Sequence, residues 1–527
     1  MRVTGLEPVT AGTGARRRPS FADGHEERLD QRRSVAAVGM AGVAGVSATT
    51  AAICLVVELL TGAEEWLSFA TTLVLAAALA AGLGLRYRLP PVARTTALLV
   101  GVVWSSLLAC GLVALPYLVS GLLDPDAAIF EAVAGVTTTS ATTVRDPGEL
   151  GHGLLLWRAA SQWTGAAGVV LLVVVALPQL GIGGLDPGGV VTRSARRVAP
   201  RASAAIRRLG AVYVGLTVIA GIAYVAVGMP TFEALIHALT TASTGGFSTR
   251  AGSLGAFDSA AIEIVAIVVM AAAGTSLPLA WRVVRRREFG ALWSSVEFRM
   301  YFLVLVVVAV VHLAGNGVDD GVPTGIRQSA FASTSAISTT GFEIQSLAAI
   351  DPGAAAILIL GMGTGAMAAS LSGGFKLVRV MAVYGFVRRE LVRQLHPGLK
   401  ASVRVGRSAL SEPMVNRMIG SISLSLGLLV VGALVLSAVD PALDSSTAII
   451  DAVSIAVTSV ANAGPADVGG ASLSWPAGLG VVGRLTSSAL MLVGRVEVTP
   501  VLVAAGLTSE RLTVLVPRRR PNRQLDR

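Results

Sequence analysis

The chain has 527 residues, of which 53% are hydrophobic and only 14% are charged, and this composition excludes an ordinary soluble protein. The apolar residues occur in long runs, so we interpret the chain as an all-α polytopic membrane protein. The net charge of +10 comes from arginines that cluster beside these runs. That placement is typical of membrane orientation and lipid contact, and we expect no nucleic-acid partner.

About ten apolar runs are long enough to cross a hydrocarbon core of about 30 Å. They lie at 35–60, 65–86, 96–122, 153–180, 209–229, 258–282, 298–315, 352–375, 416–438 and 477–505. The first run is longer than the core of a signal peptide and lacks a convincing cleavage site, so we interpret it as a retained anchor.

Basic residues mark alternate loops between these runs. Arginines precede the first run and recur in every second loop, whereas the opposite loops contain Glu64, Glu65, Asp124 and Asp126. Since basic loops remain in the cytoplasm, we expect a multi-pass protein of the cell membrane with both termini cytoplasmic. The basic positions are Arg16, Arg17, Arg18, Arg28, Arg32, Arg33, Arg86, Arg88, Arg94, Arg193, Arg196, Arg197, Arg201, Arg207, Arg208, Arg282, Arg285, Arg286, Arg287, the segment from Lys376 to Arg417, Arg518, Arg519 and Arg520. The opposite loops also contain Asp319 and Asp320, and their basic exceptions are Arg145, Arg250 and Arg327.

One short element occurs four times, each copy between two apolar runs. The copies are AIFEAVAGVTTTSA (128–141), ALIHALTTASTGGF (234–247), SAFASTSAISTTGF (329–342) and AVSIAVTSVANAGP (452–465). Repeated pore elements predict two leading helices followed by four pseudo-fourfold helix/pore-loop/helix units. The predicted regions are a basic N-terminus (1–34), leading helices (35–90), pore units 1 to 4 (91–200, 201–290, 291–400, 401–510) and a basic tail (511–527).

Each copy predicts a half-helix that ends in a tight turn at membrane depth. Such backbone is tolerated only where it lines a wet cavity or is buried in protein. Glycine-rich turns can point carbonyl oxygens at an axis, and helix C-termini favour cations there. Glu131, Glu233 and Asp451 are expected to add to this negative field. The alternative is that these small-residue segments only pack helices together.

Several motifs resemble the Trk/Ktr/HKT superfamily of potassium transporters, and most closely its TrkH-type pore subunits. They are FEAVAGVTTTSAT (130–142), WRAASQWTGAAG (157–168), TGGFST (244–249), STTGF (338–342), NAGP (462–465) and MLVGRVEVTPVLV (491–503). The resemblance implies a four-unit pore with the plan of a potassium channel, assembly as a homodimer, and a cytoplasmic nucleotide-binding regulatory subunit of the TrkA type. It implies potassium as substrate and no cofactor in this chain.

The resemblance also implies a selectivity filter that holds the potassium ion. Its residues would be Thr138, Thr139, Ser140, Thr244, Gly245, Gly246, Thr339, Thr340, Gly341, Asn462, Ala463 and Gly464. Ser140 departs from the family's glycine, so we expect a strained turn or an added side-chain oxygen there. In the plant-type branch, serine at this place accompanies sodium permeability, and a sodium-permeable transporter is therefore the alternative.

The stretch GMGTGAMAASLSGGFKLVR (361–379) resembles the intramembrane loop that gates the family's pore. The implied gate residues are Gly365, Gly373, Gly374, Lys376 and Arg495, with Arg495 as a barrier below the filter. Four non-glycine residues predict a more helical loop here, and a helix-packing face is the alternative. They are Ala366, Ala368, Ala369 and Leu371.

Lys376 also opens a basic segment, 376–400, that alternates apolar and basic positions. We expect its side chain to reach the inner membrane surface. The segment is expected to form an amphipathic surface helix or to receive a regulatory subunit.

The sequence contains no phosphate-binding GxxxxGK[ST], no HExxH and no GxSxG, and we expect no enzyme activity. A secondary solute or ion symporter built from repeats remains an alternative, although four tandem pore elements fit it less well than two inverted halves.

Overall fold

The computed structural model describes residues 21–90, 93, 95–175, 198–316, 321–345, 350–396, 402–406, 408–440, 448–464 and 475–508. The predicted basic segments at Arg16–Arg18, Arg193–Arg197 and Arg518–Arg520 lie outside this part of the chain. So do the end of the predicted amphipathic segment, 397–400, and the acidic residues Asp319 and Asp320.

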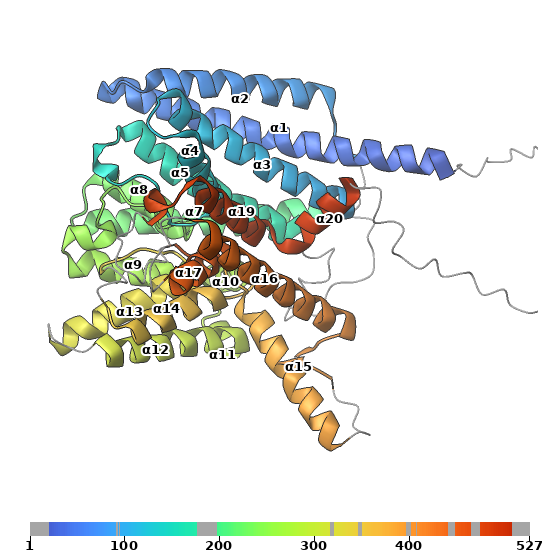
Figure 1. Cartoon of the computed structure of the whole chain (residues 1–527), viewed down its shortest axis with the longest axis vertical. Coiled ribbons are helices and arrows are strands. Elements are labelled where there is room, and N and C mark those ends of the chain that lie inside the picture. The colour runs from blue at the N-terminus through green and yellow to red at the C-terminus, as the bar shows by residue number, and fades with distance from the viewer. Residues whose placement is uncertain are drawn as a thin grey trace, which may run out of the picture.

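Two leading helices, α1 (Phe21–Thr61) and α2 (Trp66–Arg86), pack against each other and against α3 (Thr95–Val119) on one side of the bundle (Figure 1). Their shared contact is built from small residues, including Ala44, Ala48 and Ala76, which allow the helix backbones to approach closely. Apolar side chains cover the outer faces, where Leu60 is 82% exposed. A bundle that is apolar outside as well as inside is suited to lipid.

Four helix/half-helix/helix units follow, as the repeats predict. Unit 1 contains α3, α4 (Pro125–Thr137) and α5 (His152–Val175). Unit 2 contains α7 (Val198–Ala226), α8 (Thr231–Ala242), α9 (Ala260–Ala273) and α10 (Leu277–Arg286). Unit 3 contains α12 (Val296–Asn316), α13 (Val322–Ser338), α14 (Pro352–Thr364) and α15 (Leu377–Leu395). Unit 4 contains α16 (Glu412–Val439), α17 (Ala448–Ala461), α19 (Val481–Val496) and α20 (Val498–Thr508). The turns that follow the short half-helices α4, α8, α13 and α17 contact one another, so the C-terminal ends of these helices meet.

Three of the predicted spans are not straight helices. The run 258–282 bends by 106° between α9 and α10, and the run 477–505 bends by 101° between α19 and α20. The run 352–375 contains only the 13-residue α14, followed by non-helical backbone. Pro278 and Pro500 lie in the first turns of α10 and α20, where proline is tolerated but cannot continue a preceding helix.

Among the described residues, six helices are long and apolar enough to cross a membrane, and counting each bent pair as one span raises this number to eight. The predicted total of about ten is reached only by adding α5 and the broken α14 segment to these eight.

The remaining elements are short. They are η1 (Pro147–Glu149), η2 (Ser253–Phe257), α11 (Gly290–Ser294) and α18 (Trp475–Gly478). An antiparallel hairpin, β1 (Arg404–Val405) and β2 (Ser408–Ala409), pairs Arg404 with Ala409 and packs against α15. In Figure 1, α15 projects away from the bundle at the end where α16 begins.

Candidate ion-conduction site

All four half-helices end in the same backbone motif. Each is followed by a residue in the left-handed conformation, with φ between 52° and 57°: Thr138, Thr244, Thr339 and Asn462. The amide of the next residue donates to the carbonyl five positions earlier at 2.8–3.0 Å, the bond that defines a Schellman cap. Glycine usually occupies the left-handed position, because side chains are strained there. Four non-glycine residues in this place mark four equivalent and tightly constrained turns.

Two residues further on, the predicted filter glycines adopt positive φ as well. Gly246, Gly341 and Gly464 have φ of 78°, 75° and 99°. A Cβ added to Gly246 would lie 1.9 Å from the carbonyl oxygen of Thr340, and one added to Gly341 would lie 2.5 Å from that of Ala463. The turns of units 2, 3 and 4 therefore meet so closely that only glycine fits.

Ser140 takes the fourth position of this ring but differs from the glycines. It is not among the residues with positive φ, so its backbone does not have the strain that the sequence led us to consider. Its hydroxyl donates to the carbonyl oxygen of Gly341 at 3.1 Å. A Cβ on Gly464 would lie 1.8 Å from the Ser140 Oγ. The hydroxyl thus lies among the other turns and donates a hydrogen bond to one of their carbonyl oxygens.

Side chains from neighbouring helices hold the turns together. Gln162 of α5 donates to the Gly245 carbonyl at 2.8 Å and accepts from the Phe247 amide at 3.2 Å, which ties unit 2 to unit 1. Asn462 Nδ2 donates to Thr139 Oγ1 at 3.2 Å and to the Met491 carbonyl at 2.8 Å, which ties unit 4 to unit 1. Together with the contacts between glycine turns, these bonds close a ring of four units.

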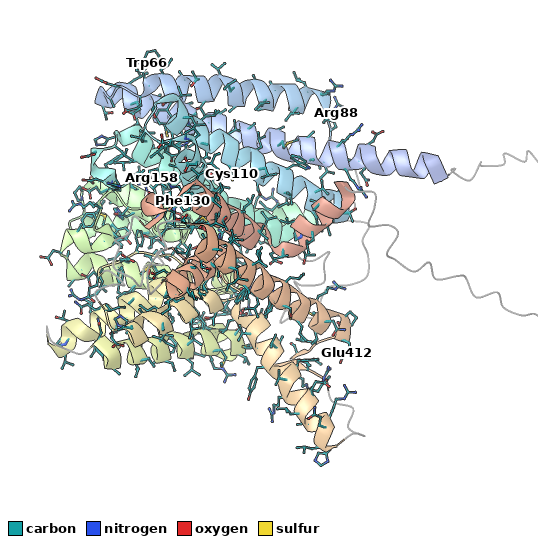
Figure 2. The ribbon with its side chains drawn as sticks, in the orientation of Figure 1. Trp66, Arg88, Cys110, Phe130, Arg158 and Glu412 are labelled. Carbon is teal, nitrogen blue, oxygen red and sulfur yellow. The ribbon has the colours of Figure 1, made fainter. Side chains whose placement is uncertain are left out.

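Glu131 does not provide free negative charge, which corrects the expectation from the sequence. It is fully buried and pairs at 2.9 Å with Arg158 of α5, which is labelled in Figure 2. Arg158 also covers the ring of Phe247. Glu233 is likewise in an ion pair, because Arg250 donates to both of its carboxylate oxygens at 3.0 Å. A paired carboxylate contributes little field at a distance, so the backbone has to supply most of the negative potential.

The segment between α14 and α15, residues 365–376, is not helical, and the expectation of a more helical loop was wrong. Gly365 and Gly374 have φ of 67° and 74°, and the Phe375 amide donates back to the Gly363 carbonyl at 3.0 Å. We call residues 365–376 the intramembrane loop.

The intramembrane loop is held by the breaks and ends of other helices. Met367 N donates to the Gly274 carbonyl at 3.2 Å, and Leu277 N donates to the Ala369 carbonyl at 3.0 Å, so the loop is paired with the bend of unit 2. On the other side, Gly374 N donates to the Ala461 carbonyl at the end of α17 at 2.8 Å. The loop therefore lies between units 2 and 4.

The loop also contacts one of the predicted filter residues directly. Gly373 N donates to Thr339 Oγ1 at 2.6 Å. Arg495 of α19 donates from Nη1 to the Leu371 carbonyl at 3.2 Å. Its Nε and Nη2 are buried and have no hydrogen-bond partner within the described part of the chain. A guanidinium with spare donors against the loop is suited to interact with the conduction path.

Lys376 does not reach outward as we expected. Its Nζ donates back to the carbonyl and, at 3.3 Å, to the hydroxyl of Ser372, inside the loop. The ammonium is therefore bonded within the loop itself.

Two contacts that anchor the loop were not found from the sequence. Glu297 at the start of α12 accepts from the Ala368 amide at 2.5 Å. Arg379, just after the loop, pairs with Glu497 in the α19/α20 break at 2.6 Å. Arg158 and Gln162 were noticed only as part of a matching segment. Their partners are far away in the sequence, so local spacing gave no signal for these contacts.

The architecture and the site define a class of protein: a multi-pass membrane protein in which one chain supplies four pore units around a central ring of turns. The chain belongs to the TrkH family, described as cation transport proteins, whose model matches residues 69–513.

Individual relatives agree with this assignment. The chain is 33% identical to the Trk system potassium uptake protein TrkH of Salmonella typhimurium over 338 residues, covering 62% of this chain and 69% of the relative. It is 32% identical to TrkH of Escherichia coli K12 with the same coverage. The crystal structure of the potassium transporter TrkH from Vibrio parahaemolyticus superposes with a TM-score of 0.77 at 26% identity, covering 92% of this chain and 98% of that one. The family and fold predicted from the sequence are confirmed.

Proposed function

We propose that this chain takes up potassium across the cell membrane, and that the four convergent turns are its selectivity filter. The observation that carries the proposal is the fourfold repetition of one cap: four half-helices present their C-terminal ends and the following carbonyls to one place. Helix C-termini carry partial negative charge, and rings of carbonyls replace the hydration shell of a cation. The names of the similar transporters, which are potassium uptake proteins, support potassium as the ion.

The filter residues of this proposal are those expected from the sequence. Backbone oxygens would bind the ion, since Glu131 and Glu233 are paired with arginines. The proposal needs no cofactor in the chain and no catalytic residues, because carbonyl geometry and the membrane potential suffice for conduction.

In this proposal the intramembrane loop is the gate. Its bonds to Thr339, to Ala461 and to the unit 2 bend place it directly against the turns, and the spare donors of Arg495 form an electrostatic barrier to a cation. Replacing Gly373 and Gly374 together by alanine should alter flux and its regulation. Unchanged flux and regulation in that variant would remove the gating role.

Sodium permeability is the second candidate, and Ser140 is the observation that favours it. The Ser140 hydroxyl donates a hydrogen bond to the Gly341 carbonyl and adds a side-chain oxygen to the ring. A ring with altered size and ligand number is expected to discriminate less strictly between potassium and sodium.

The test is uptake of both ions by a bacterium that lacks its own potassium uptake systems and expresses this chain or its Ser140→Gly variant. Rescue of growth at low potassium, with strong potassium preference, supports the first candidate. Sodium uptake that the glycine variant suppresses supports the second, and no uptake of either ion by a correctly inserted protein contradicts both.

Assembly and orientation belong to the same proposal. We propose a homodimer with both termini in the cytoplasm, surrounded by membrane lipid and regulated by a nucleotide-binding subunit of the TrkA type. The relatives are named as proteins of a Trk system, which supports a system of several components. The exposed face of α15 and the β1–β2 hairpin, at the end of the bundle where α16 begins, is the proposed contact for that subunit.

A further inference from the structure

Equivalent positions behind the filter turns are filled differently in the four units. In the aligned repeats, Glu131 of unit 1 corresponds to His237 of unit 2. Glu131 accepts from the Thr142 hydroxyl and from the Thr143 amide, each at 2.9 Å. His237 Nε2 lies 3.1 Å from the hydroxyl of Ser248, the residue that corresponds to Thr142. In both units a half-helix side chain thus supports the segment that leaves the filter.

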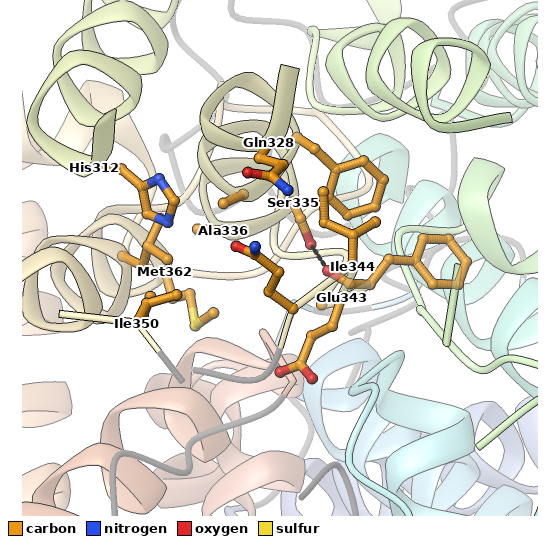
Figure 3. A pocket seen from close by; sticks show the side chains of 14 residues that line it. His312, Gln328, Ser335, Ala336, Glu343, Ile344, Ile350 and Met362 are labelled. Carbon is orange, nitrogen blue, oxygen red and sulfur yellow. Dashed lines mark hydrogen bonds between the residues drawn. The ribbon is translucent and has the colours of Figure 1, made fainter. Parts of the chain in front are cut away.

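Unit 3 has no such side chain. The corresponding residue is Ala332, and the residue that corresponds to Thr142 is Glu343. A cavity lies here instead, lined by both residues, with a volume of about 40 Å³ available to water (Figure 3). About 10–15 Å³ of such volume holds one water molecule. The cavity is therefore large enough for more than one.

Polar groups reach this cavity from several elements. His312 of α12 is only 2% exposed, and its Nδ1 lies 3.0 Å from the Ser329 hydroxyl. Its Nε2 has no hydrogen-bond partner in the residues that the structure describes, although the ring lines the cavity. Gln328 and Gln345 line the cavity as well. A ring nitrogen beside a cavity can bond to water, and a water molecule needs two to four polar partners of this kind.

We propose that this cavity, between His312 and the third filter turn, is a site for ordered water, which supports that turn in place of the side chains of Glu131 and His237. The role in the filter rests on the proposed function, whereas the presence of water does not. The intramembrane loop also touches the third turn, through Gly373 and Thr339. Water, unlike a fixed side chain, allows this turn to adjust when the loop contact changes.

Hydroxyl-radical footprinting by X-ray radiolysis of the purified full-length protein tests the water site. Met362 lines the cavity and is 4% exposed, whereas Met270 is 0% exposed in a packed apolar cluster and serves as internal reference. Because methionine oxidation requires radicals formed from nearby water, Met362 should oxidise at least about tenfold faster than Met270. Equal rates for the two methionines would overturn the proposal.

Two variants of Ala332 sharpen this test. Ala332→Leu fills the cavity with apolar atoms and should bring the Met362 rate down to that of Met270. Ala332→Ser leaves room for water and should keep the fast rate. Fast oxidation that persists in Ala332→Leu, in protein of unchanged fold by circular dichroism, would show that the radicals come from elsewhere.

The supporting role in the filter is tested by rubidium uptake in vesicles. Ala332→Leu leaves His312 Nε2 without a partner behind the turn, so uptake should fall by at least about fivefold relative to Ala332→Ser. Equal uptake by the two variants overturns the supporting role even if footprinting confirms the water. Absence of uptake by the unmodified chain instead contradicts the proposed function and leaves the footprinting result standing.

Discussion

Ser140→Gly is the most informative change in this chain, because it removes the side chain at the position where the other three turns have glycine. In the structure the Ser140 hydroxyl donates to the Gly341 carbonyl at 3.1 Å. A potassium ion that uses this carbonyl has to compete with that bond. A typical hydrogen bond contributes about 0.5–1.5 kcal/mol net, which corresponds to a roughly 2- to 12-fold change in an equilibrium constant. The half-saturating potassium concentration for uptake should therefore fall by roughly that factor in the glycine variant.

The assay is initial-rate rubidium or potassium uptake into proteoliposomes over a range of external concentrations, with sodium uptake measured in parallel. Ser140→Ala is the matched control, because it removes the hydroxyl but keeps the Cβ. If the hydrogen bond is the cause, the alanine and glycine variants should shift the half-saturating concentration alike. An unchanged half-saturating concentration in both variants, with normal maximal rates, would refute the reasoning.

The remaining predictions concern the barrier, the loop and the support of the filter. Arg495→Ala removes the two unpartnered donors and should raise cation conductance in planar bilayers; conductance equal to that of the parent would contradict the barrier role. Gly373→Ala would place a Cβ 1.9 Å from the Ala461 carbonyl and should displace the loop and change flux, whereas Gly82→Ala, at a site with open space, should not; identical fluxes would argue against contact gating. Arg158→Met leaves Glu131 buried and unpaired, so thermal unfolding of the detergent-solubilised protein should shift down, by an amount that corresponds to about 3–5 kcal/mol; an unchanged midpoint would show that the pair is not structural.

Much of the fold could be predicted because the signals were local. Each span is a contiguous apolar run, and each filter turn is a contiguous repeat, so hydropathy and self-similarity place both. The bend at Gly274 was missed because apolar residues continue after it, and the bend at Glu497 was missed because apolar residues resume directly after this single charge. Pro278 and Pro500 were visible signals, since a proline ends or bends the helix that precedes it.

The contacts that shape the site could not be predicted in this way. Arg158 bonds to Glu131 across 27 positions of sequence, and Gln162 bonds to Gly245 across 83. Arg379 bonds to Glu497 across 118. The charges alone suggested a negative field from Glu131, and only the fold shows that this charge is paired. Likewise, the left-handed conformation of Thr138, Thr244 and Thr339 could not be predicted from the sequence, because it is imposed by the helix cap and not by residue type.

The claim that the four turns form a cation site is tested most directly by anomalous X-ray diffraction from crystals of the protein grown in rubidium. We expect rubidium density on the axis between the turns at Ser140, Gly246, Gly341 and Gly464, within reach of their carbonyl oxygens. Rubidium bound elsewhere in the protein, with none at these turns in a preparation that transports the ion, would contradict it.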